Sequence, residues 1–286
     1  MSSTPSAFYV AAAVVGLIIG SLITQVAWRL PRMMEAGFLR ADARNGGSPA
    51  PEWTLARYGL LMPAAACTSC GHPLELKDQA PLLSYLFLRG RCRACGAGIG
   101  LRYPLIEGAT AVIALLCVYR FGFTLAGLAA FLGCALLLTI ALVDLESTLI
   151  PDSLTASVAI LGVVANALWL PLGWEASLIG AASGLAGLWI AAAGYRLLAR
   201  REGVGFGDVK LLGALGAWVG AAALPVLAIL AGIAFLVAAA LSRTRTAVLQ
   251  DPEPELPFGP SLALAGSLLI LAPGLSAMVV RAVHWL

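Results

Sequence analysis

Four of the six cysteines in this 286-residue chain form two pairs with metal-ligand spacing. Cys67 and Cys70 make the first Cys-x-x-Cys pair, Cys92 and Cys95 make the second, and a glycine follows each pair. Such a knuckle directs two thiolates at one cation, so two knuckles complete the tetrahedral sulfur site that Zn²⁺ prefers. Four thiolates leave no open coordination position, so the pattern predicts a structural zinc site. Two disulfides or free thiols are the alternatives.

Two aspartates at the ends of apolar segments indicate acid–base chemistry. Asp144 closes one segment in ALVDLES, and Asp208 opens another in GFGDVKL. Two neighbouring carboxylates share a proton, so one acts as base and the other as acid. This arrangement can activate water for attack on a peptide carbonyl and protonate the leaving amine. Gly205 and Gly207 support this interpretation because they leave room for a peptide backbone beside Asp208; a helix-capping role for Asp208 is the alternative.

Two further acids could support that site. Glu107 lies a few residues into an apolar segment, where a carboxylate is costly. It is either a buried support of the active site or an ion-paired anchor. Asp152 follows Ile150-Pro151, at a position where a carboxylate stabilises a helix N-terminus. That structural role is the alternative to active-site support for Asp152.

The composition is that of an integral membrane protein. Hydrophobic residues make up 60% of the chain and charged residues only 12%, with a mean hydropathy of +0.91. An ordinary soluble domain carries about 25% charged residues. These values exclude a soluble enzyme, a nucleic-acid-binding protein and a disordered chain.

Apolar segments of membrane-spanning length predict an all-α polytopic fold with about eight transmembrane helices. The expected spans are 7–28, 104–119, 122–143, 152–171, 175–198, 208–221, 223–242 and 261–284. The span 208–221 is short, so seven spans are the alternative. The predicted domains are a first helix at 1–29, a zinc-ribbon-like insert at 30–103, and a peptidase core at 104–286. Residues 243–260 are predicted to form a loop.

The basic residues predict the orientation of the spans. With eight spans and an external N-terminus, sixteen of the 18 lysines and arginines face the cytoplasm. The insert is then cytoplasmic, where thiols stay reduced, which favours metal over disulfides. The first span has no basic residue before it, so we expect a retained anchor rather than a cleaved signal peptide.

In the order of its motifs the chain resembles the type IV prepilin leader peptidases, bifunctional peptidases and N-methyltransferases of the GxGD aspartic class. The resemblance covers nearly the whole chain. Besides the two thiol pairs it includes Gly20-Ser21, Arg29-Leu30-Pro31, PLLSYLFLRGRC (81–92), RYPLIEG (102–108), Asp144 with Ile150-Pro151-Asp152, Gly205-Phe206-Gly207-Asp208 and Pro257-Phe258-Gly259-Pro260.

The resemblance implies both an activity and its residues. Asp144 and Asp208 match the catalytic pair of the family, and the four paired cysteines match its metal-binding thiols. The family removes the basic leader of prepilins and of type II secretion pseudopilins after a glycine, at the cytoplasmic face of the bacterial inner membrane. It then methylates the new N-terminus, commonly Phe, with S-adenosylmethionine. Gly90 is a candidate for the methyl-donor site, with a plain turn glycine as the alternative.

Other functions remain to be weighed against this one. A transporter or channel would also place acids in apolar segments, but usually near the bilayer midplane rather than at one edge. A peptidase-only relative would lack methyl transfer, although the full PLLSYLFLRGRC segment and both thiol pairs favour the bifunctional form. A non-catalytic assembly factor would depend on its thiols and not on its aspartates.

Overall fold

The computed structural model describes residues 6–49, 51, 59–60, 65–67, 69–199, 205–249, 256–272 and 274–275. In this part of the chain the regular structure is helical, with two isolated β-bridges in the cysteine insert. The chain divides into an N-terminal unit, Met1–Val118, and a C-terminal unit, Tyr119–Leu286. The predicted all-α fold is confirmed in these residues.

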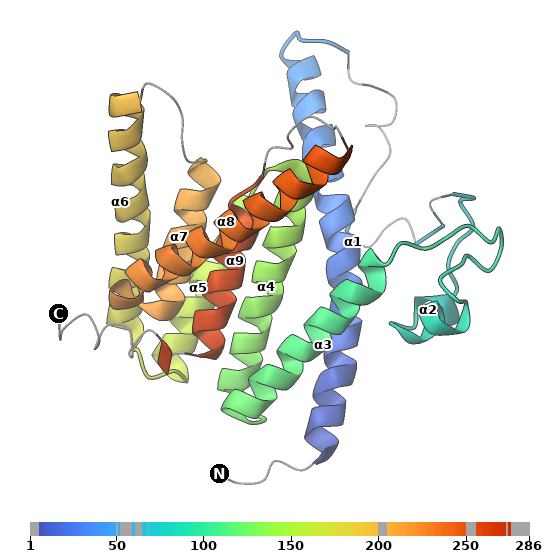
Figure 1. Ribbon diagram of the computed structural model, residues 1–286, viewed down its shortest axis with the longest axis horizontal. Coiled ribbons are helices and arrows are strands. Elements are labelled where there is room, and N and C mark those ends of the chain that lie inside the picture. Colours follow the sequence, from blue (N-terminus) through green and yellow to red (C-terminus); the bar gives the residue numbers. More distant parts are fainter. Residues whose placement is uncertain are drawn as a thin grey trace. The chain divides into compact units, whose positions relative to one another are not determined.

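Two long helices form the frame of the N-terminal unit (Figure 1). They are α1, Ser6–Arg44, and α3, Arg102–Phe121. Gly16 and Gly20 of α1 lie directly against the α3 backbone: a Cβ atom on Gly16 would lie 2.6 Å from the Ala111 Cα, and one on Gly20 would lie 2.7 Å from the Glu107 Cα. Small residues at this spacing let two apolar helices approach closely, as is common in membranes.

The helix α1 continues well beyond the predicted end of the first span at residue 28. It includes Pro31 and ends at Arg44, so the first part of the predicted insert is helical. Residues 33–44 are mostly strong helix formers, such as Met, Glu, Ala, Leu and Arg, which carry the helix onward. The predicted first span therefore forms only the N-terminal part of a longer helix.

Between α1 and α3, the insert contains two short helices and the cysteine loops. The short helices are η2, Leu76–Gln79, and α2, Leu83–Phe87. The bridges Ala66↔Pro73 and Arg91↔Gly98 close the two cysteine loops. The insert thus depends on short turns rather than on long elements.

In its described residues the C-terminal unit contains six longer helices (Figure 1), and the short η3, Ala221–Ala223, lies between α7 and α8. They are α4, Leu125–Ser147; α5, Asp152–Leu168; α6, Trp174–Ala199; α7, Phe206–Val219; α8, Leu224–Leu249; and α9, Gly259–Leu271. Residues 243–249 were predicted as loop, but they extend α8 because no proline or glycine interrupts the chain before Pro252. Part of the last predicted span, 261–284, lies outside the described residues.

Within the described part of the chain, five helical segments are long and apolar enough to cross a membrane. These are Ser6–Arg44, Arg102–Phe121, Leu125–Ser147, Trp174–Leu198 and Ala221–Ser242. The helices α5 and α9 are apolar but shorter. The protein is therefore a membrane protein, with α5, α7 and α9 as its short helices.

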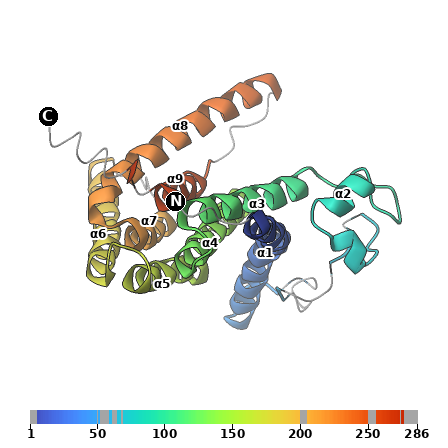
Figure 2. The same cartoon turned by 90° about the horizontal axis from the view of Figure 1, so that it is seen from below.

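The centre of the C-terminal unit is α7, which contacts α5, α6 and α9 (Figure 2). Glycines permit this packing: a Cβ on Gly184 of α6 would lie 2.6 Å from the Leu212 carbonyl oxygen of α7. On another side, the Trp218 ring fits against Gly133 and Gly162, and its indole N–H donates a 2.9 Å hydrogen bond to the Val158 carbonyl. These contacts fix α7 and with it the aspartate in its first turn.

Candidate functional site

The ends of two helices of the C-terminal unit bring Asp144 and Asp208 together. Asp144 lies near the end of α4, and Asp208 lies in the first turn of α7. The two carboxyl groups interact electrostatically although 64 positions separate them in the chain. Asp144 is only 4% exposed, whereas Asp208 is half-buried. The two residues predicted as a catalytic pair therefore lie close enough to interact, and their catalytic role stays a prediction.

Backbone groups from two other segments hold these carboxylates. The amide of Gly259, the first residue of α9, donates a hydrogen bond to the Asp144 carboxylate. A Cβ atom at Gly259 would overlap that carboxylate. The amide of Gly205, the N-cap residue of α7, donates to the Asp208 carboxylate. Asp208 therefore sits at the third helical position and reaches back to its own N-cap, as the acid of a capping box does.

The glycines beside Asp208 differ in conformation. Gly205 is extended at φ −65°, ψ 143°, and Gly207 already belongs to the first turn of α7. A Cβ on Gly207 would lie 3.0 Å from the Cβ of Ile150. Gly207 therefore makes room for the loop between α4 and α5 beside the aspartate pair.

Asp152 is not a buried member of this site. It is the first residue of α5, its side chain is 74% exposed, and it pairs with Lys210 of α7 at 2.6 Å. The Lys210 ammonium also lies 4.7 Å from the centroid of the Phe206 ring. The pair links the N-terminal parts of α5 and α7.

The four paired cysteines converge in the N-terminal unit. Their sulfur atoms all lie within 4.8 Å of one another, and the Cys67 and Cys95 sulfurs are 3.9 Å apart. A tetrahedron with Zn–S bonds of about 2.3 Å has S–S edges of about 3.8 Å. The cluster therefore has the size of a four-thiolate metal site.

The two cysteine loops have the same backbone geometry. Gly71 donates its N–H to the Cys67 carbonyl at 2.9 Å, and Gly96 donates to the Cys92 carbonyl at 2.9 Å. Both glycines have φ +71°, a left-handed conformation that glycine adopts at little cost. In the first loop, the amides of Cys70 and Ser69 donate to the Cys67 sulfur and lower the pKa of that thiol to about 6. The residues present therefore fit a divalent metal such as zinc.

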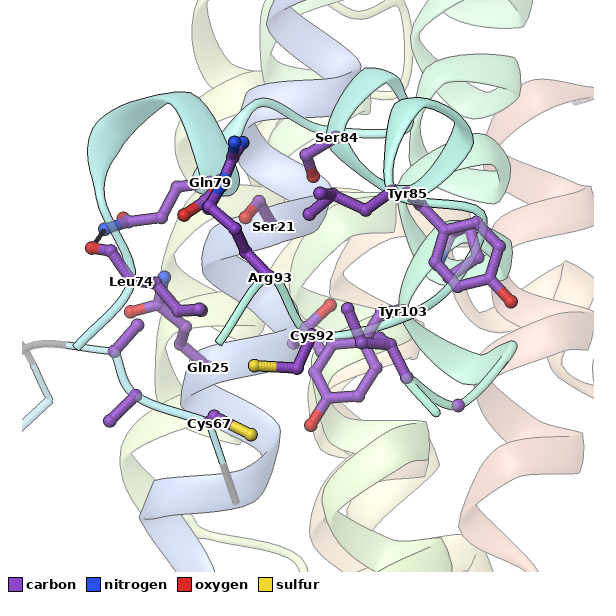
Figure 3. A pocket seen from close by; sticks show the side chains of 18 of the residues that line it. Ser21, Gln25, Cys67, Leu74, Gln79, Ser84, Tyr85, Cys92, Arg93 and Tyr103 are labelled. Atoms are coloured by element: carbon purple, nitrogen blue, oxygen red, sulfur yellow. Dashed lines mark hydrogen bonds and ion pairs between the residues drawn. The ribbon is translucent and has the colours of Figure 1, made fainter. Parts of the chain in front are cut away.

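Beside the thiol cluster, the N-terminal unit contains a cavity of about 500 Å³ (Figure 3). Its walls come from α1, α2, α3 and both cysteine loops. Glu107 lines it and is only 8% exposed. The Glu107 carboxylate accepts a 2.8 Å hydrogen bond from the Leu82 N–H and another from the Ser21 hydroxyl. Glu107 thus joins α1 and α3 to the insert within the N-terminal unit.

Gly90 lies next to this cavity and close to Tyr85, one of the residues that line it. It has φ +67°, and a Cβ there would lie 2.8 Å from the Tyr85 hydroxyl oxygen. Tyr85 is a lining residue. The turn interpretation of Gly90 and a role in the cavity wall are therefore compatible.

Two features of the structure were not predicted, although the sequence does indicate them. The function of Gly259 in PFGP was not inferred, although a glycine followed by proline at the start of an apolar segment marks a helix start. The polar residues Ser21, Gln25 and Arg29 recur at intervals of four in the first helix. That spacing predicts one polar face on an otherwise apolar helix.

Comparison with known proteins separates the same two regions. The family model described as Bacterial Peptidase A24 N-terminal domain matches residues 14–121. The model described as Type IV leader peptidase family matches residues 131–240, which include both aspartates.

Full-length relatives carry both activities in their names. A "Prepilin leader peptidase/N-methyltransferase" of Burkholderia pseudomallei is 42% identical over 257 residues, covering 90% of this chain and 82% of the relative. Proteins of the same name from Pseudomonas aeruginosa and Neisseria gonorrhoeae are 38% and 34% identical, over 95% and 96% of this chain and 92% and 93% of each relative. No solved structure matches the chain significantly.

Proposed function

Because the chain belongs to the type IV leader peptidase family, we propose that it is a bifunctional enzyme that cleaves prepilins and pseudopilins and then N-methylates the product. Relatives named for both activities match it over most of its length. The observation that carries the peptidase half is the meeting of Asp144 and Asp208 at helix ends inside the region matched by the leader peptidase model. The cut follows a glycine that ends the basic leader.

In the proposed cleavage the two aspartates divide the proton transfers. One carboxylate takes a proton from water as the water oxygen attacks the scissile carbonyl carbon. The other carboxyl group gives its proton to the leaving nitrogen as the C–N bond breaks. The amide of Gly259 fixes the Asp144 carboxylate, and Gly205 fixes that of Asp208. A Cβ at Gly205 would meet only the Asp208 carboxylate, at 3.4 Å, so Gly205 leaves space beside Asp208 for the substrate backbone.

The second reaction needs a methyl donor, and we propose S-adenosylmethionine. It supplies a methyl group on a positively charged sulfonium sulfur. The free amine of the new N-terminus, commonly Phe, forms the new C–N bond with the methyl carbon and loses a proton, while sulfur keeps the electrons of the broken C–S bond. The product is S-adenosylhomocysteine. Cleavage must come first because it creates this amine.

We propose that Cys67, Cys70, Cys92 and Cys95 hold a structural Zn²⁺. The distances between their sulfur atoms support this assignment, as do the matched turns of the two loops. Four thiolates fill a tetrahedral shell, so this metal would shape the insert and take no part in proton transfer.

We propose that eight helices cross the bacterial inner membrane, with the N-terminus outside. This topology places sixteen of the 18 lysines and arginines on the cytoplasmic side. The aspartate pair, at the end of α4 and the start of α7, then faces the cytoplasm, where the basic leader lies. By role we divide the chain into a first membrane span within 1–29, the cysteine insert, 30–103, and the peptidase core, 104–286. Asp152 has a supporting role in the core, and Glu107 has a supporting role in the N-terminal unit, where it accepts hydrogen bonds from Leu82 and Ser21.

Mass spectrometry of a purified prepilin tests the proposed function directly. We expect the wild-type protein in detergent micelles to remove the leader and, with S-adenosylmethionine present, to add one methyl group to the new N-terminus. An Asp208→Asn variant should leave the prepilin intact, because an amide cannot carry the proton. Cleavage by that variant at the wild-type rate would refute the assigned catalytic pair.

A further inference from the structure

One apolar side chain lies against the aspartate site but has no part in the proposed proton transfers. It belongs to Ile150, a half-buried residue in the loop between α4 and α5. We infer that Ile150 determines the glycine specificity of the cleavage, because its side chain fills the space beside the aspartate pair that a larger residue before the cut would need. The inference rests on the proposed peptidase activity and adds to it a residue that selects the substrate.

The Ile150 side chain packs against the starts of two helices that form the site. A Cβ atom on Gly207, the residue before Asp208, would lie 3.0 Å from the Ile150 Cβ. A Cβ on Gly259 would lie 3.1 Å from the Ile150 Cδ1 and would also overlap the Asp144 carboxylate. Both distances are shorter than an ordinary carbon–carbon contact of about 3.5–4.0 Å. Ile150 therefore occupies the side-chain space at both glycines and places a branched alkyl group beside the two carboxylates.

The backbone of the loop holds this side chain in place. Thr148 ends α4 with φ +52°, a conformation that is strained for a β-branched residue and of the kind that concentrates at active sites. Pro151 follows Ile150 and restricts it to an extended backbone. The Pro151 carbonyl accepts hydrogen bonds from the N–H and the hydroxyl of Thr155, both at 3.1 Å. The loop is thus fixed at both ends, so Ile150 has little freedom to move aside for a substrate.

Peptide cleavage brings the residue before the cut to this point. The scissile carbonyl carbon must lie beside both carboxylates, because one activates the attacking water and the other protonates the leaving nitrogen. The Cα of the residue before the cut is bonded to that carbonyl carbon, so its Cβ would also start beside the carboxylates. Glycine has no Cβ and fits, whereas any other residue competes with Ile150 for the same space. Close-packed neighbours accommodate an added carbon only at a cost.

The test uses two purified prepilins that differ only in the residue before the cut, which is glycine in one and alanine in the other. Values of kcat/KM are measured with the full-length protein in detergent micelles. The wild-type protein should strongly prefer the glycine prepilin. We expect Ile150→Ala to raise kcat/KM for the alanine prepilin by about ten- to hundredfold, the usual value of a methylene-sized change in a pocket, and to change it for the glycine prepilin by less than about tenfold.

Two further variants sharpen the test. Ile150→Val removes only the Cδ1 atom, which is the atom of Ile150 that lies nearest to the Cβ position of Gly259. It should raise cleavage of the alanine prepilin by a smaller factor, about two- to tenfold. The matched control Ile160→Ala makes the same change as Ile150→Ala at a residue of α5 that is 65% exposed, and it should keep the wild-type preference. If Ile150→Ala is too unstable to cleave either prepilin, the comparison of Ile150→Val with wild type decides the inference.

The outcomes separate this inference from the proposed function. If the Ile150 variants cleave both prepilins more slowly but keep the wild-type ratio between them, Ile150 only supports the fold; the inference is then overturned and the peptidase stands. A wild-type protein that cleaves the alanine prepilin as fast as the glycine prepilin would overturn it too. A wild-type protein that cleaves neither prepilin would refute the proposed function itself.

Discussion

The two units hold their reactive groups by different means. In the C-terminal unit, Asp144 and Asp208 are fixed by the backbone amides of Gly259 and Gly205 at the ends of packed helices. In the N-terminal unit, we propose that the methyl donor binds in the cavity lined by Tyr85, Tyr103 and Glu107, whose walls include short turns and the two cysteine loops besides α1 and α3. The first site depends on close helix packing, whereas the second depends on local turns and, as we propose, on a metal.

Because of this difference, we expect leader cleavage and methyl transfer to respond to different structural changes. A change in helix packing near α7 or α9 should reach the aspartates first. A change in the metal or in the turns of residues 67–98 should reach the cavity first, because Cys67 and Cys92 are themselves lining residues.

Loss of either aspartate should have the largest effect. We expect Asp144→Asn or Asp208→Asn to lower the rate of leader cleavage by about 10²- to 10⁴-fold, the usual contribution of a general acid or base. Binding of S-adenosylmethionine should stay at the wild-type level. Mass-spectrometric cleavage assays and donor binding would be measured on the same preparations. An Asp42→Asn variant of the exposed end of α1 is the matched control, and a similar loss in that control would contradict the assignment.

A methyl group at Gly259 should come next. Gly259→Ala places a Cβ on the Asp144 carboxylate, and a displacement of about 1 Å in a catalytic group can cost about 10²-fold in rate. We expect cleavage to fall by this order while the protein still inserts and binds the donor. Gly232→Ala in α8 meets no atom within 4 Å and should cleave normally. Equal cleavage by the two variants would show that Gly259 does not position Asp144.

Removal of the metal should act on the other unit. Cys92→Ser should abolish zinc binding, measured by inductively coupled plasma mass spectrometry, and weaken donor binding by about tenfold or more as the cavity wall loses its shape. Leader cleavage should fall by a smaller factor. The buried Cys134 of α4 provides a control, since Cys134→Ser should keep its zinc. A zinc-free wild-type protein with four reduced thiols would refute the metal site.

A smaller change at Gly90 tests the part of the cavity wall that Tyr85 forms. A non-glycine residue in the left-handed conformation costs about 1–2 kcal/mol, and the added Cβ would also push Tyr85. We expect Gly90→Ala to weaken donor binding by about five- to thirtyfold and to leave cleavage intact. Gly108→Ala in α3, with no atom within 4 Å of the added Cβ, is the control. If cleavage falls instead of donor binding, Gly90 has been placed in the wrong reaction.

The smallest effect concerns an ion pair in the cavity wall. Arg93 donates hydrogen bonds to Asp78 at 2.6 and 2.9 Å, and these bonds and the charge of Arg93 lower the pKa of the Asp78 carboxyl. The pair therefore stabilises the insert above the ordinary Asp pKa of about 4 and loses that contribution as the pH falls through the lowered value. Donor binding should be unaffected by this pair between pH 8 and 6. Arg93→Gln should weaken binding only about two- to threefold, and a large pH dependence that this variant removes would contradict this role.

The sequence predicted the C-terminal unit better than the insert, for physical reasons. Spans of apolar residues give a strong signal for helices, and carboxylates at their ends are conspicuous, so α4, α7 and their aspartates were expected. The contact between Gly259 and Asp144 joins residues 115 positions apart, and no local pattern encodes such a contact. The apolar span was predicted to end near residue 28, where charged residues begin at Arg29, but the helix α1 continues to Arg44.

The cavity could not be predicted from composition or spacing. Cys-x-x-Cys spacing predicts a metal cluster because the chemistry is local to each loop. The cavity instead requires α1, α2 and α3 to be placed in space, and its polar residues are distributed over some 90 positions. Glu107 illustrates the limit: its burial was foreseen as one alternative, but its bonds to Leu82 and Ser21 were not.

The most direct test of two separate sites is a crossed assay of Asp208→Asn and Glu107→Gln. Each variant receives labelled S-adenosylmethionine with either an intact prepilin or a pilin from which the leader has already been removed. We predict that Asp208→Asn methylates only the pre-cleaved pilin, and that Glu107→Gln cleaves the prepilin but methylates neither substrate efficiently. Failure of folded Asp208→Asn to methylate pre-cleaved pilin, or normal methylation by Glu107→Gln, would contradict the account.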